Sequence, residues 1–503
     1  MSKSLAKDSM TLMGGRGLTF IVSAITPMIL VRIFSVGEYG EYRQAMLIAT
    51  TAALFLPLGL PNSLFYFFPN FPEAKGKYLM QTIAVMTLTG SLFCLLMWLR
   101  VEDLCLFFNN TKYLKTSVLI GALAFMLSSS SLIETVLLAD GRVLLSTQIM
   151  TAAKIIQVPI VIACAFTGGF ILLLKGLMLV LLGKFILSLC FFRGSYRISL
   201  LGLVGNTWLP HLKYAIPLGL GAVCSLAAET ADKFFVSHYL GEKMFAIYST
   251  GCYELPFMLV IFSSIGDVVL PLIVQQKTLN NTAEVVRIWH RAIEQSMLIG
   301  IPIFIFFFVY ATEFITTVFT MKYIDAVPIF RISIITILLE SSRYGLITRG
   351  YARTGFMFFV SLAALLLMLL ATYLGIRYIG MIGAIIAFVS TRCLIVGSEI
   401  GYSKYILSLQ WRHLLPFNFM AKIAALSFLC LLLPVTSSHF FALSNNWLQL
   451  FYLLAFSFCS FAYLTNYMGY WDVNSLPLPA DPKRWLQHIF HGRRCNNWMS
   501  HNH

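Results

Sequence analysis

The fold of this chain is decided by stretches such as FILLLKGLMLVLLGKFILSLCFF, which occupies residues 170–192. The stretch is long enough to cross a bilayer, because a membrane-spanning helix needs about 20 apolar residues. Its apolar residues run together instead of alternating with polar ones, which argues against a strand of a membrane barrel. It nevertheless contains Lys175 and Lys184. A cation within hydrocarbon is costly and usually marks a functional position.

Apolar stretches of this kind fill most of the sequence. Of the 503 residues, 58% are hydrophobic and 11% are charged, whereas soluble domains carry about 25% charged residues. The mean hydropathy is +0.81. We therefore predict an all-α, polytopic membrane protein with about fourteen transmembrane helices. The predicted spans are 12–34, 45–68, 79–99, 117–138, 148–167, 170–192, 214–237, 246–274, 292–311, 326–347, 356–376, 379–400, 420–440 and 447–468, with a tight hairpin at Thr167–Gly169.

Basic residues outnumber acidic ones and give a formal net charge of +15. In a membrane chain this excess indicates basic cytoplasmic loops and contact with anionic membrane lipids, and we expect no nucleic acid partner. With the N-terminus inside, the inner segments hold 19 Lys and Arg residues and the outer segments hold 7. The asymmetry predicts that both termini are cytoplasmic, including a basic tail at 471–503.

The sequence shows no pattern for catalysis or metal binding. The ten cysteines are scattered singly, and the nine histidines have neither HExxH nor another metal-ligand spacing. No nucleophile–base arrangement or phosphate-binding glycine loop is evident. We therefore expect a protein that is not an enzyme, with no catalytic residue, metal or cofactor, while coupling to protons or sodium ions stays open.

Ten basic residues fall inside the predicted spans. Lys184 and Arg392 lie more than ten residues from the start of their spans, which is near the bilayer middle at a rise of about 1.5 Å per residue. Arg343 lies nearer a span end, where long side chains reach the interface, and we expect it to pair with Glu340, three residues earlier. The ten are Arg16, Arg32, Lys154, Lys175, Lys184, Lys233, Arg331, Arg343, Arg392 and Lys422.

Two similar stretches indicate an internal duplication. A Gly-Glu pair follows a span at Gly37-Glu38 and again at Gly241-Glu242, 204 positions later, each with a tyrosine opening the next helix. That distance corresponds to six spans with their loops, an even number, so the two halves would enter the membrane in the same direction. We predict two pseudo-symmetric six-helix lobes, 1–205 and 206–410, and two further helices within 411–470. Lys184 and Arg392 would then occupy equivalent helices.

Four motifs resemble the polysaccharide transport branch of the multidrug/oligosaccharidyl-lipid/polysaccharide (MOP) flippase superfamily, which includes O-antigen flippases. They are Gly14-Gly15-Arg16-Gly17, VGEYGEYR (36–43), GLPNSLFYFFPNFPE (59–73) and ADKFFVSHYLGE (231–242). The resemblance covers the whole chain in length, span count and repeat. It implies two lobes around a central cavity, alternating access, and cationic side chains that engage the pyrophosphate of a lipid carrier.

The candidate site residues are charged side chains within the spans. Glu229, Asp232 and Lys233 are spaced i, i+3 and i+4, so they share one face of the seventh span. Glu229 and Asp232 are candidates for ion coupling, and a purely structural pair between Glu229 and Lys233 is the alternative. For Arg16 the alternative is contact with lipid headgroups. The candidates for substrate binding are Arg16, Lys154, Lys184, Lys233 and Arg392.

The resemblance implies a transporter that flips an undecaprenyl pyrophosphate-linked oligosaccharide from the inner to the outer leaflet of the bacterial cell inner membrane. Its product would serve O-antigen, lipopolysaccharide or related polysaccharide biosynthesis. The expected partners are the lipid-linked oligosaccharide and membrane lipids, with a polymerase or ligase left open. A multidrug or cation antiporter of the same superfamily is one alternative, and it would favour an acidic, aromatic cavity. A membrane polysaccharide polymerase is a second alternative, and such an enzyme would need a sizeable outer domain or loop that carries catalytic groups.

The loop charges generate a first prediction. A phosphatase fused after His503 should be inactive, because the 19-to-7 distribution of basic residues places this end in the cytoplasm. A cytoplasmic reporter fused at the same residue should be active. Phosphatase activity from the His503 fusion would overturn the orientation.

Overall fold

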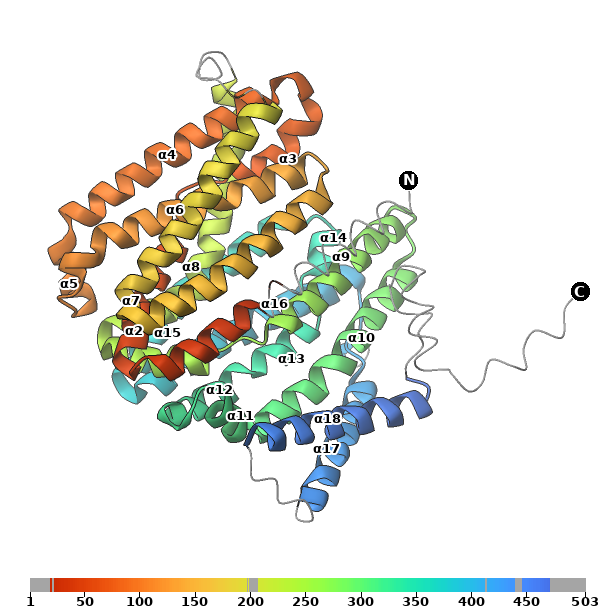
Figure 1. Ribbon diagram of the computed structural model, residues 1–503. Coiled ribbons are helices and arrows are strands. Elements are labelled where there is room, and N and C mark those ends of the chain that lie inside the picture. The colour runs from red at the N-terminus through yellow and green to blue at the C-terminus, as the bar shows by residue number, and fades with distance from the viewer. Residues whose placement is uncertain are drawn as a thin grey trace, which may run out of the picture. The chain divides into compact units, whose positions relative to one another are not determined.

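The computed structural model describes residues 19, 22–196, 198, 207–411, 414–438 and 446–470, and these residues form helices without a β-strand (Figure 1). The predicted all-α class is confirmed. The chain divides into two compact units. Unit 1 comprises Met1–Phe257, Val318–Ser333 and Phe358–Ile395, and unit 2 comprises Met258–Thr317, Ile334–Met357 and Val396–His503.

Unit 1 begins with a helix at Val22–Ile33. The core of this unit gathers apolar residues of four helices, with Phe68, Leu79, Val136 and Phe192 among the most buried. Its elements are α2 (Val36–Phe55), α3 (Leu60–Asn70), η1 (Pro72–Ala74), α4 (Lys75–Leu99), α5 (Val101–Phe108), α6 (Tyr113–Ala139), α7 (Val143–Tyr196), α8 (Trp208–Gly251), η3 (Met321–Ala326), α12 (Val327–Ser333) and the larger parts of α15 (Thr354–Ile379) and α16 (Met381–Leu407).

Unit 2 is built around one central helix. Trp289 and Ile293 of this helix, α10, are fully buried in a cluster that also contains Ile273 and Ile423. The last two helices of the chain, α17 and α18, pack against α10 and against each other. The elements of this unit are α9 (Pro256–Thr278), α10 (Thr282–Val309), α11 (Ala311–Val318), α13 (Ile335–Ser341), α14 (Leu346–Gly350), α17 (Phe417–Ser438) and α18 (Asn446–Tyr467).

Most of these helices are long and apolar enough to cross a membrane. Nine helices of the described residues meet this test, and the bent pair Trp208–Cys224 and Leu226–Gly251 raises the number to ten. The helix α7 is 54 residues long, or about 80 Å at 1.5 Å per residue, so it contains two spans. The polytopic helical fold is therefore confirmed, and the number fourteen stays a prediction.

Two helical hairpins each turn at a glycine with a positive φ. Within α7 the helical geometry breaks at Gly168 and Gly169, and Gly169 has φ 68°. Gly380, between α15 and α16, has the same φ. This left-handed conformation strains residues that carry a Cβ. The ideal Cβ position at Gly176 lies 2.5 Å from the sulfur of Cys164, so the two halves of α7 pack as the hairpin that the sequence predicts.

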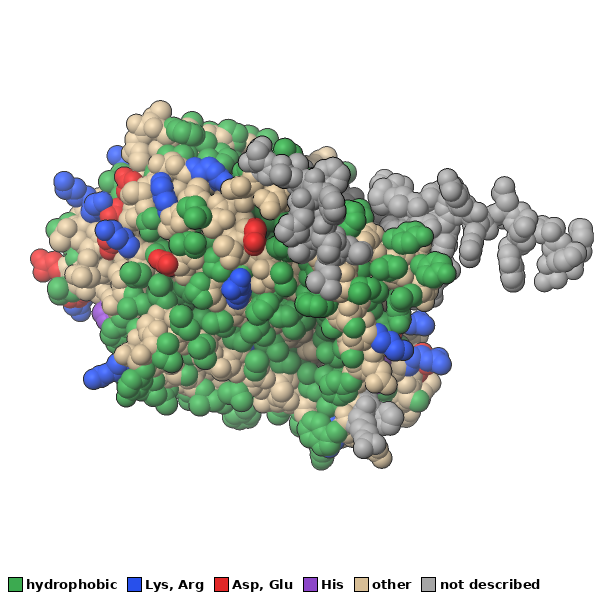
Figure 2. Space-filling view, turned by 90° about the horizontal axis from the view of Figure 1, so that it is seen from below, with side chains coloured by type: hydrophobic (Ala, Val, Ile, Leu, Met, Phe, Trp, Pro, Cys, Tyr) green, Lys and Arg blue, Asp and Glu red, His purple; other side chains and the backbone are tan. Residues whose placement is uncertain are grey.

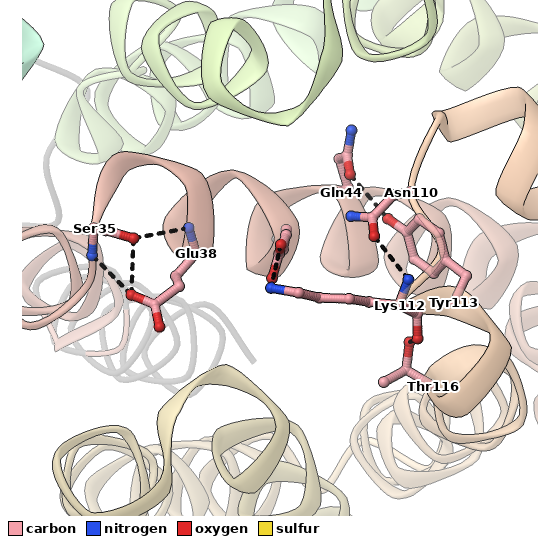
Figure 3. A network of polar contacts seen from close by, with 8 residues as sticks. Ser35, Glu38, Gln44, Asn110, Lys112, Tyr113 and Thr116 are labelled. Carbon is pink, nitrogen blue, oxygen red and sulfur yellow. Dashed lines mark hydrogen bonds and ion pairs between the residues drawn. The ribbon is translucent and has the colours of Figure 1, made fainter.

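The helix α2 starts at a reciprocal cap. The backbone N–H of Glu38 donates to the Ser35 hydroxyl at 3.3 Å, and the N–H of Ser35 donates to the Glu38 carboxylate at 3.0 Å. This capping box satisfies amides that the first turn leaves unpaired. Further along α2, Glu41 binds the ammonium of Lys112 at 2.6 Å. Figure 3 shows Lys112 and Tyr113, at the start of α6, beside α2. The network ties α2 to the start of α6.

The two duplicated Gly-Glu motifs lie against each other. A Cβ on Gly40 would collide with the backbone carbonyl of Glu242, and the nearest atoms to a Cβ on Gly37 belong to the side chain of Lys243. The helix α2 therefore packs closely along α8. Gly241 itself interrupts the helical geometry of α8, with φ 76°.

Apolar side chains dominate much of the exposed surface. Leu88, Leu179 and Leu187 are 69, 67 and 71% exposed, and Figure 2 shows that such side chains cover much of one face. In water a surface of this kind would drive aggregation, whereas hydrocarbon solvates it. The chain is a multi-pass membrane protein.

The order of elements also repeats along the chain. The helix α4 is followed after one residue by the eight-residue α5, and α10 is followed after one residue by the eight-residue α11. The hairpin glycines Gly169 and Gly380 are 211 positions apart. The division into lobes at 1–205, 206–410 and 411–470 stays a prediction.

The close approach at Gly40 generates a second prediction. Gly40→Ala should lower the melting temperature of the purified protein, because the added methyl group meets a backbone carbonyl that cannot rotate away, and such overpacking costs about 1–3 kcal/mol. Gly37→Ala is the matched control. It lies on the same helix, its Cβ would be 3.7 Å from a flexible lysine chain, and it should be neutral or mildly stabilising. Equal melting temperatures for the two variants would contradict the packing.

Candidate functional site

Lys184 forms an ion pair with Glu134. The lysine Nζ lies 2.6 Å from the glutamate Oε1, and the two side chains are 15 and 23% exposed. Lys184 belongs to the second half of α7 and Glu134 belongs to α6, and these helices pack along each other. Each charge therefore receives from another helix the counter-ion that a low-dielectric environment requires.

Lys154 extends this pair to a cluster of three charges. It lies on the first half of α7, and its ammonium interacts electrostatically with Lys184, which repels it, and with Glu134, which attracts it. One carboxylate thus serves two ammonium groups. When all three groups are ionised, the cluster has an excess of positive charge that a bound anion would neutralise.

Arg392 has a carboxylate partner of its own. Its Nη2 lies 3.1 Å from Oε1 of Glu229, and the two side chains are 24 and 51% exposed. The guanidinium also lies 5.6 Å from the ring centroid of Phe388 on the same helix, a distance at which the ring face attracts a cation. Glu229 comes from α8, so this pair also joins two helices. The alternative pairing of Glu229 with Lys233 is not the one that forms.

Asp232 lies apart from these pairs. It is 1% exposed, and its Oδ2 accepts a hydrogen bond of 2.6 Å from the hydroxyl of Tyr248. Its Oδ1 has no hydrogen-bond partner among the described residues. Lys233 is half-buried and attracts Asp232 electrostatically. The face predicted for Glu229, Asp232 and Lys233 therefore divides, with Glu229 reaching Arg392 and Asp232 enclosed beside Tyr248.

The candidate residues are distributed unevenly over the structure. Lys154, Lys184, Lys233 and Arg392 all belong to unit 1. Lys154 and Lys184 share one carboxylate, and Arg392 has another. Arg16 lies outside the described residues, so its role stays a prediction.

Sequence reasoning missed two polar positions, one half-buried and one fully buried. Glu134 was not among the candidates, and its only signal is a carboxylate inside the span predicted at 117–138. His211 is fully buried, with Nε2 2.8 Å from the hydroxyl of Ser63 and Nδ1 3.1 Å from the amide oxygen of Gln81. These contacts join α8 to α3 and α4. No spacing rule connects residues so far apart in the chain.

A third ionic cluster lies between α6 and α7, outside the spans. Asp140 contacts Nζ of Lys75 at 2.5 Å and Nε of Arg142 at 3.0 Å, and it accepts a hydrogen bond of 2.9 Å from Tyr196. Burial opposes its ionisation, but the hydrogen bonds from Lys75 and Tyr196 and the two cationic charges lower the pKa of Asp140 below its ordinary value. Its stabilising contribution is therefore present at neutral pH and is lost as the pH falls through the lowered pKa. The cluster holds the ends of three helices together.

The described residues offer no metal site. Within these ranges no group of three or more His, Cys, Asp or Glu side chains converges as metal ligands would. Two cationic positions within the spans are each neutralised by a carboxylate from another helix, and a phosphate group can compete with such a carboxylate for the same donors.

Comparison with known proteins assigns the chain to a family. The family described as "Polysaccharide biosynthesis protein" matches residues 29–328. No curated protein matches the sequence. The structure of the lipid II flippase MurJ in an inward closed conformation aligns with a TM-score of 0.70 at 15% identity, covering 92% of this chain and 98% of that chain.

Two further solved structures show the same fold. An inward-facing multidrug resistance MATE family transporter of the MOP superfamily aligns with a TM-score of 0.59 at 13% identity, over 79% of this chain and 94% of that chain. A MOP superfamily transporter from Pyrococcus furiosus aligns with a TM-score of 0.53 at 11% identity, over 80 and 94%. The chain belongs to the polysaccharide biosynthesis protein family and has the fold of MOP superfamily transporters. The resemblance drawn from the sequence is confirmed.

The pair between α6 and α7 generates a third prediction. In a double-mutant cycle, Lys184→Met and Glu134→Gln should show a coupling energy above about 0.6 kcal/mol, the average for interhelical polar contacts in membranes, because both groups are charged. The free energies of unfolding can be measured in detergent. Lys175→Met is the matched control on the same helix. Lys175 is exposed, so its effect should add to that of Glu134→Gln. Additive effects of Lys184→Met and Glu134→Gln would contradict a stabilising pair.

Proposed function

We propose that this protein moves a lipid-linked oligosaccharide, carried on undecaprenyl pyrophosphate, from the inner to the outer leaflet of a bacterial inner membrane. The oligosaccharide would supply O-antigen, lipopolysaccharide or a related surface polysaccharide. The family match and the transporter fold support a role in polysaccharide biosynthesis at the membrane. The observation that carries the proposal is the set of cations within the spans, Lys154, Lys184 and Arg392, each close to a carboxylate of another helix.

A diphosphate is the ligand chemistry that such cations fit. It carries more negative charge than one carboxylate and can accept hydrogen bonds from several donors at once. At Lys154 and Lys184 the single carboxylate of Glu134 leaves positive charge uncompensated. A diphosphate would therefore neutralise the cluster more completely than Glu134 does.

The counter-ions would also make release possible. When the diphosphate leaves, Glu134 returns to Lys184 and Glu229 returns to Arg392, so neither cation is left unpaired in a low-dielectric environment. An unpaired buried charge is costly, and the returning carboxylates lower the free energy of the empty transporter. Binding is thus an exchange of anions, which keeps affinity moderate enough for turnover.

Movement across the membrane would follow alternating access between two six-helix lobes, 1–205 and 206–410, with the helices of 411–470 outside the path. The repeat of helix lengths and hairpin glycines supports this division. Repeat-built transporters place their substrate path where the halves meet. Arg16 and Lys233 would add donors to this path, both termini would be cytoplasmic, and a polymerase or ligase would receive the product outside.

One observation favours a second candidate, a multidrug or cation antiporter of the same superfamily. Asp232 is enclosed, and its Oδ1 has no partner among the described residues, so it offers a place for a proton or a cation. Ion coupling through Asp232, with Glu229 as a second carboxylate, is compatible with either function. The excess of cations over carboxylates around Lys184 favours an anionic substrate.

The fourth prediction tests the cationic residues. Lys184→Ala or Arg392→Ala should abolish surface polysaccharide in a strain that depends on this protein, without lowering the amount of protein in the membrane. Each change removes a donor for the diphosphate. Lys184→Arg and Arg392→Lys should retain part of the export, since they keep the charge. The measurements are surface glycan staining and membrane immunoblots.

A matched control separates a binding role from a general effect on α7. Lys175→Ala removes an exposed lysine from the same helix as Lys184 and should leave export unchanged. Undecaprenyl-linked sugar should accumulate on the inner leaflet in the Lys184→Ala and Arg392→Ala strains. Normal export by both variants would refute the proposed role of the cations.

A further inference from the structure

Outside these ion pairs, Arg343 in unit 2 combines a left-handed backbone with a side-chain nitrogen that lacks a hydrogen-bond partner among the described residues. It lies between α13 and α14, inside the span predicted at 326–347, where the helix is interrupted. Its φ is +51°, a left-handed conformation that strains a residue with a Cβ. Strained backbone of this kind persists when the surrounding structure holds it, and it is common at binding sites.

The guanidinium of Arg343 has no ion-pair partner in the part of the chain that the structure describes. Its Nε–H group is buried and has no hydrogen-bond acceptor among these residues. The pair with Glu340 expected from the sequence is not formed. Because the left-handed turn follows α13, the two residues do not keep helical spacing, and the Glu340 carboxylate instead accepts a hydrogen bond of 3.0 Å from Tyr344.

A glycine of the neighbouring helix α9 leaves space for this side chain. The ideal Cβ position at Gly266 of α9 lies 2.6 Å from Nη2 of Arg343, so only glycine leaves the guanidinium its place. The guanidinium lies 5.9 Å from the ring centroid of Phe262, also on α9. On the other side, the indole N–H of the fully buried Trp289 donates to the Arg343 carbonyl at 3.4 Å. Two helices of unit 2, α9 and α10, therefore pack around this arginine.

The charged residues near Arg343 act on it electrostatically, but none of the described carboxylates forms an ion pair with it. Glu340 and Asp267 attract the guanidinium and Arg349 repels it, but neither carboxylate forms an ion pair with it within the described residues. Arginine stays protonated in proteins. The side chain is half-buried, and a partly desolvated guanidinium without a hydrogen-bonded anion lacks compensation for its charge. An anion that reached it would gain a charge-assisted contact.

We propose that Arg343 is a binding site for a lipid phosphate. The planar guanidinium fork matches two oxygens of a phosphate group, and a broken span inside a membrane protein is reached most readily by a ligand that is itself a lipid. The phosphate comes either from a prenyl diphosphate, in which case the inference rests on the proposed function, or from the phosphodiester of an anionic phospholipid. The site belongs to unit 2, whereas Lys184 and Arg392 belong to unit 1.

The test measures binding of two probes to the purified full-length protein in detergent. The probes are farnesyl diphosphate, for the carrier, and phosphatidylglycerol, for the bulk lipid, each followed by native mass spectrometry and titration. Arg343→Gln should weaken binding of one probe by about tenfold or more, because a charge-assisted contact is lost. Arg353→Gln is the matched control, since Arg353 is exposed in the following loop, and it should bind both probes normally.

Gly266→Ala provides a second variant that keeps the charge. The added methyl group takes the place of the guanidinium end, which is flexible enough to move, so the protein should fold with its arginine displaced. Its binding should weaken in the same direction. The double variant Gly266→Ala/Arg343→Gln should be no weaker than Arg343→Gln alone, because both changes disable one contact.

The outcomes distinguish this inference from the proposed function. Weaker binding of farnesyl diphosphate assigns the site to the carrier, and weaker binding of phosphatidylglycerol alone assigns it to bulk lipid. If the wild type binds neither farnesyl diphosphate nor a longer prenyl diphosphate, the proposed substrate is wrong. The phosphatidylglycerol titration then still tests whether Arg343 binds a lipid phosphate. If a folded Arg343→Gln protein binds both probes as the wild type does, the inference is overturned.

Discussion

The structure depends on one constraint, which is that the bilayer core supplies no water to satisfy a polar group. Backbone amides and carbonyls must therefore bond within helices, and the described residues form helices without strands. A charged side chain at that depth needs a partner from the protein or from a ligand. Lys184 meets this requirement with Glu134, and Arg392 meets it with Glu229.

The same constraint explains why the ionic contacts join different helices. A neighbour on the same helix reaches only three or four positions along one face, and within apolar spans such positions are rarely charged. The partner must then come from another helix, as Glu134 of α6 does for Lys184 of α7. Each pair consequently holds two spans together in the resting protein, and a competing anion would weaken that connection. Under the proposed function, anion binding would thereby be coupled to helix movement.

Arg343 departs from this pattern. Its backbone is left-handed, its carbonyl accepts a hydrogen bond from Trp289, and its guanidinium packs beside Gly266. No carboxylate of the described residues forms an ion pair with it. Asp232 shows the opposite departure, since it is a buried carboxylate whose Oδ2 accepts a hydrogen bond from Tyr248. We propose an anion as the partner of Arg343, and Asp232 stays a candidate for ion coupling.

By itself, the sequence determined the fold class and the hairpin at Thr167–Gly169, and it singled out Lys184 and Arg392 as charged residues within apolar stretches. These features follow from local composition, because apolar length and glycine spacing act within one or two helices. Only the tertiary structure decided which carboxylate meets which cation. Glu134 and Lys184 are 50 positions apart and Glu229 and Arg392 are 163 apart, so their pairing depends on how helices pack. The expected contact between Glu340 and Arg343 failed for the same reason, because a left-handed turn held by neighbouring helices overrides the helical spacing that the sequence alone predicts.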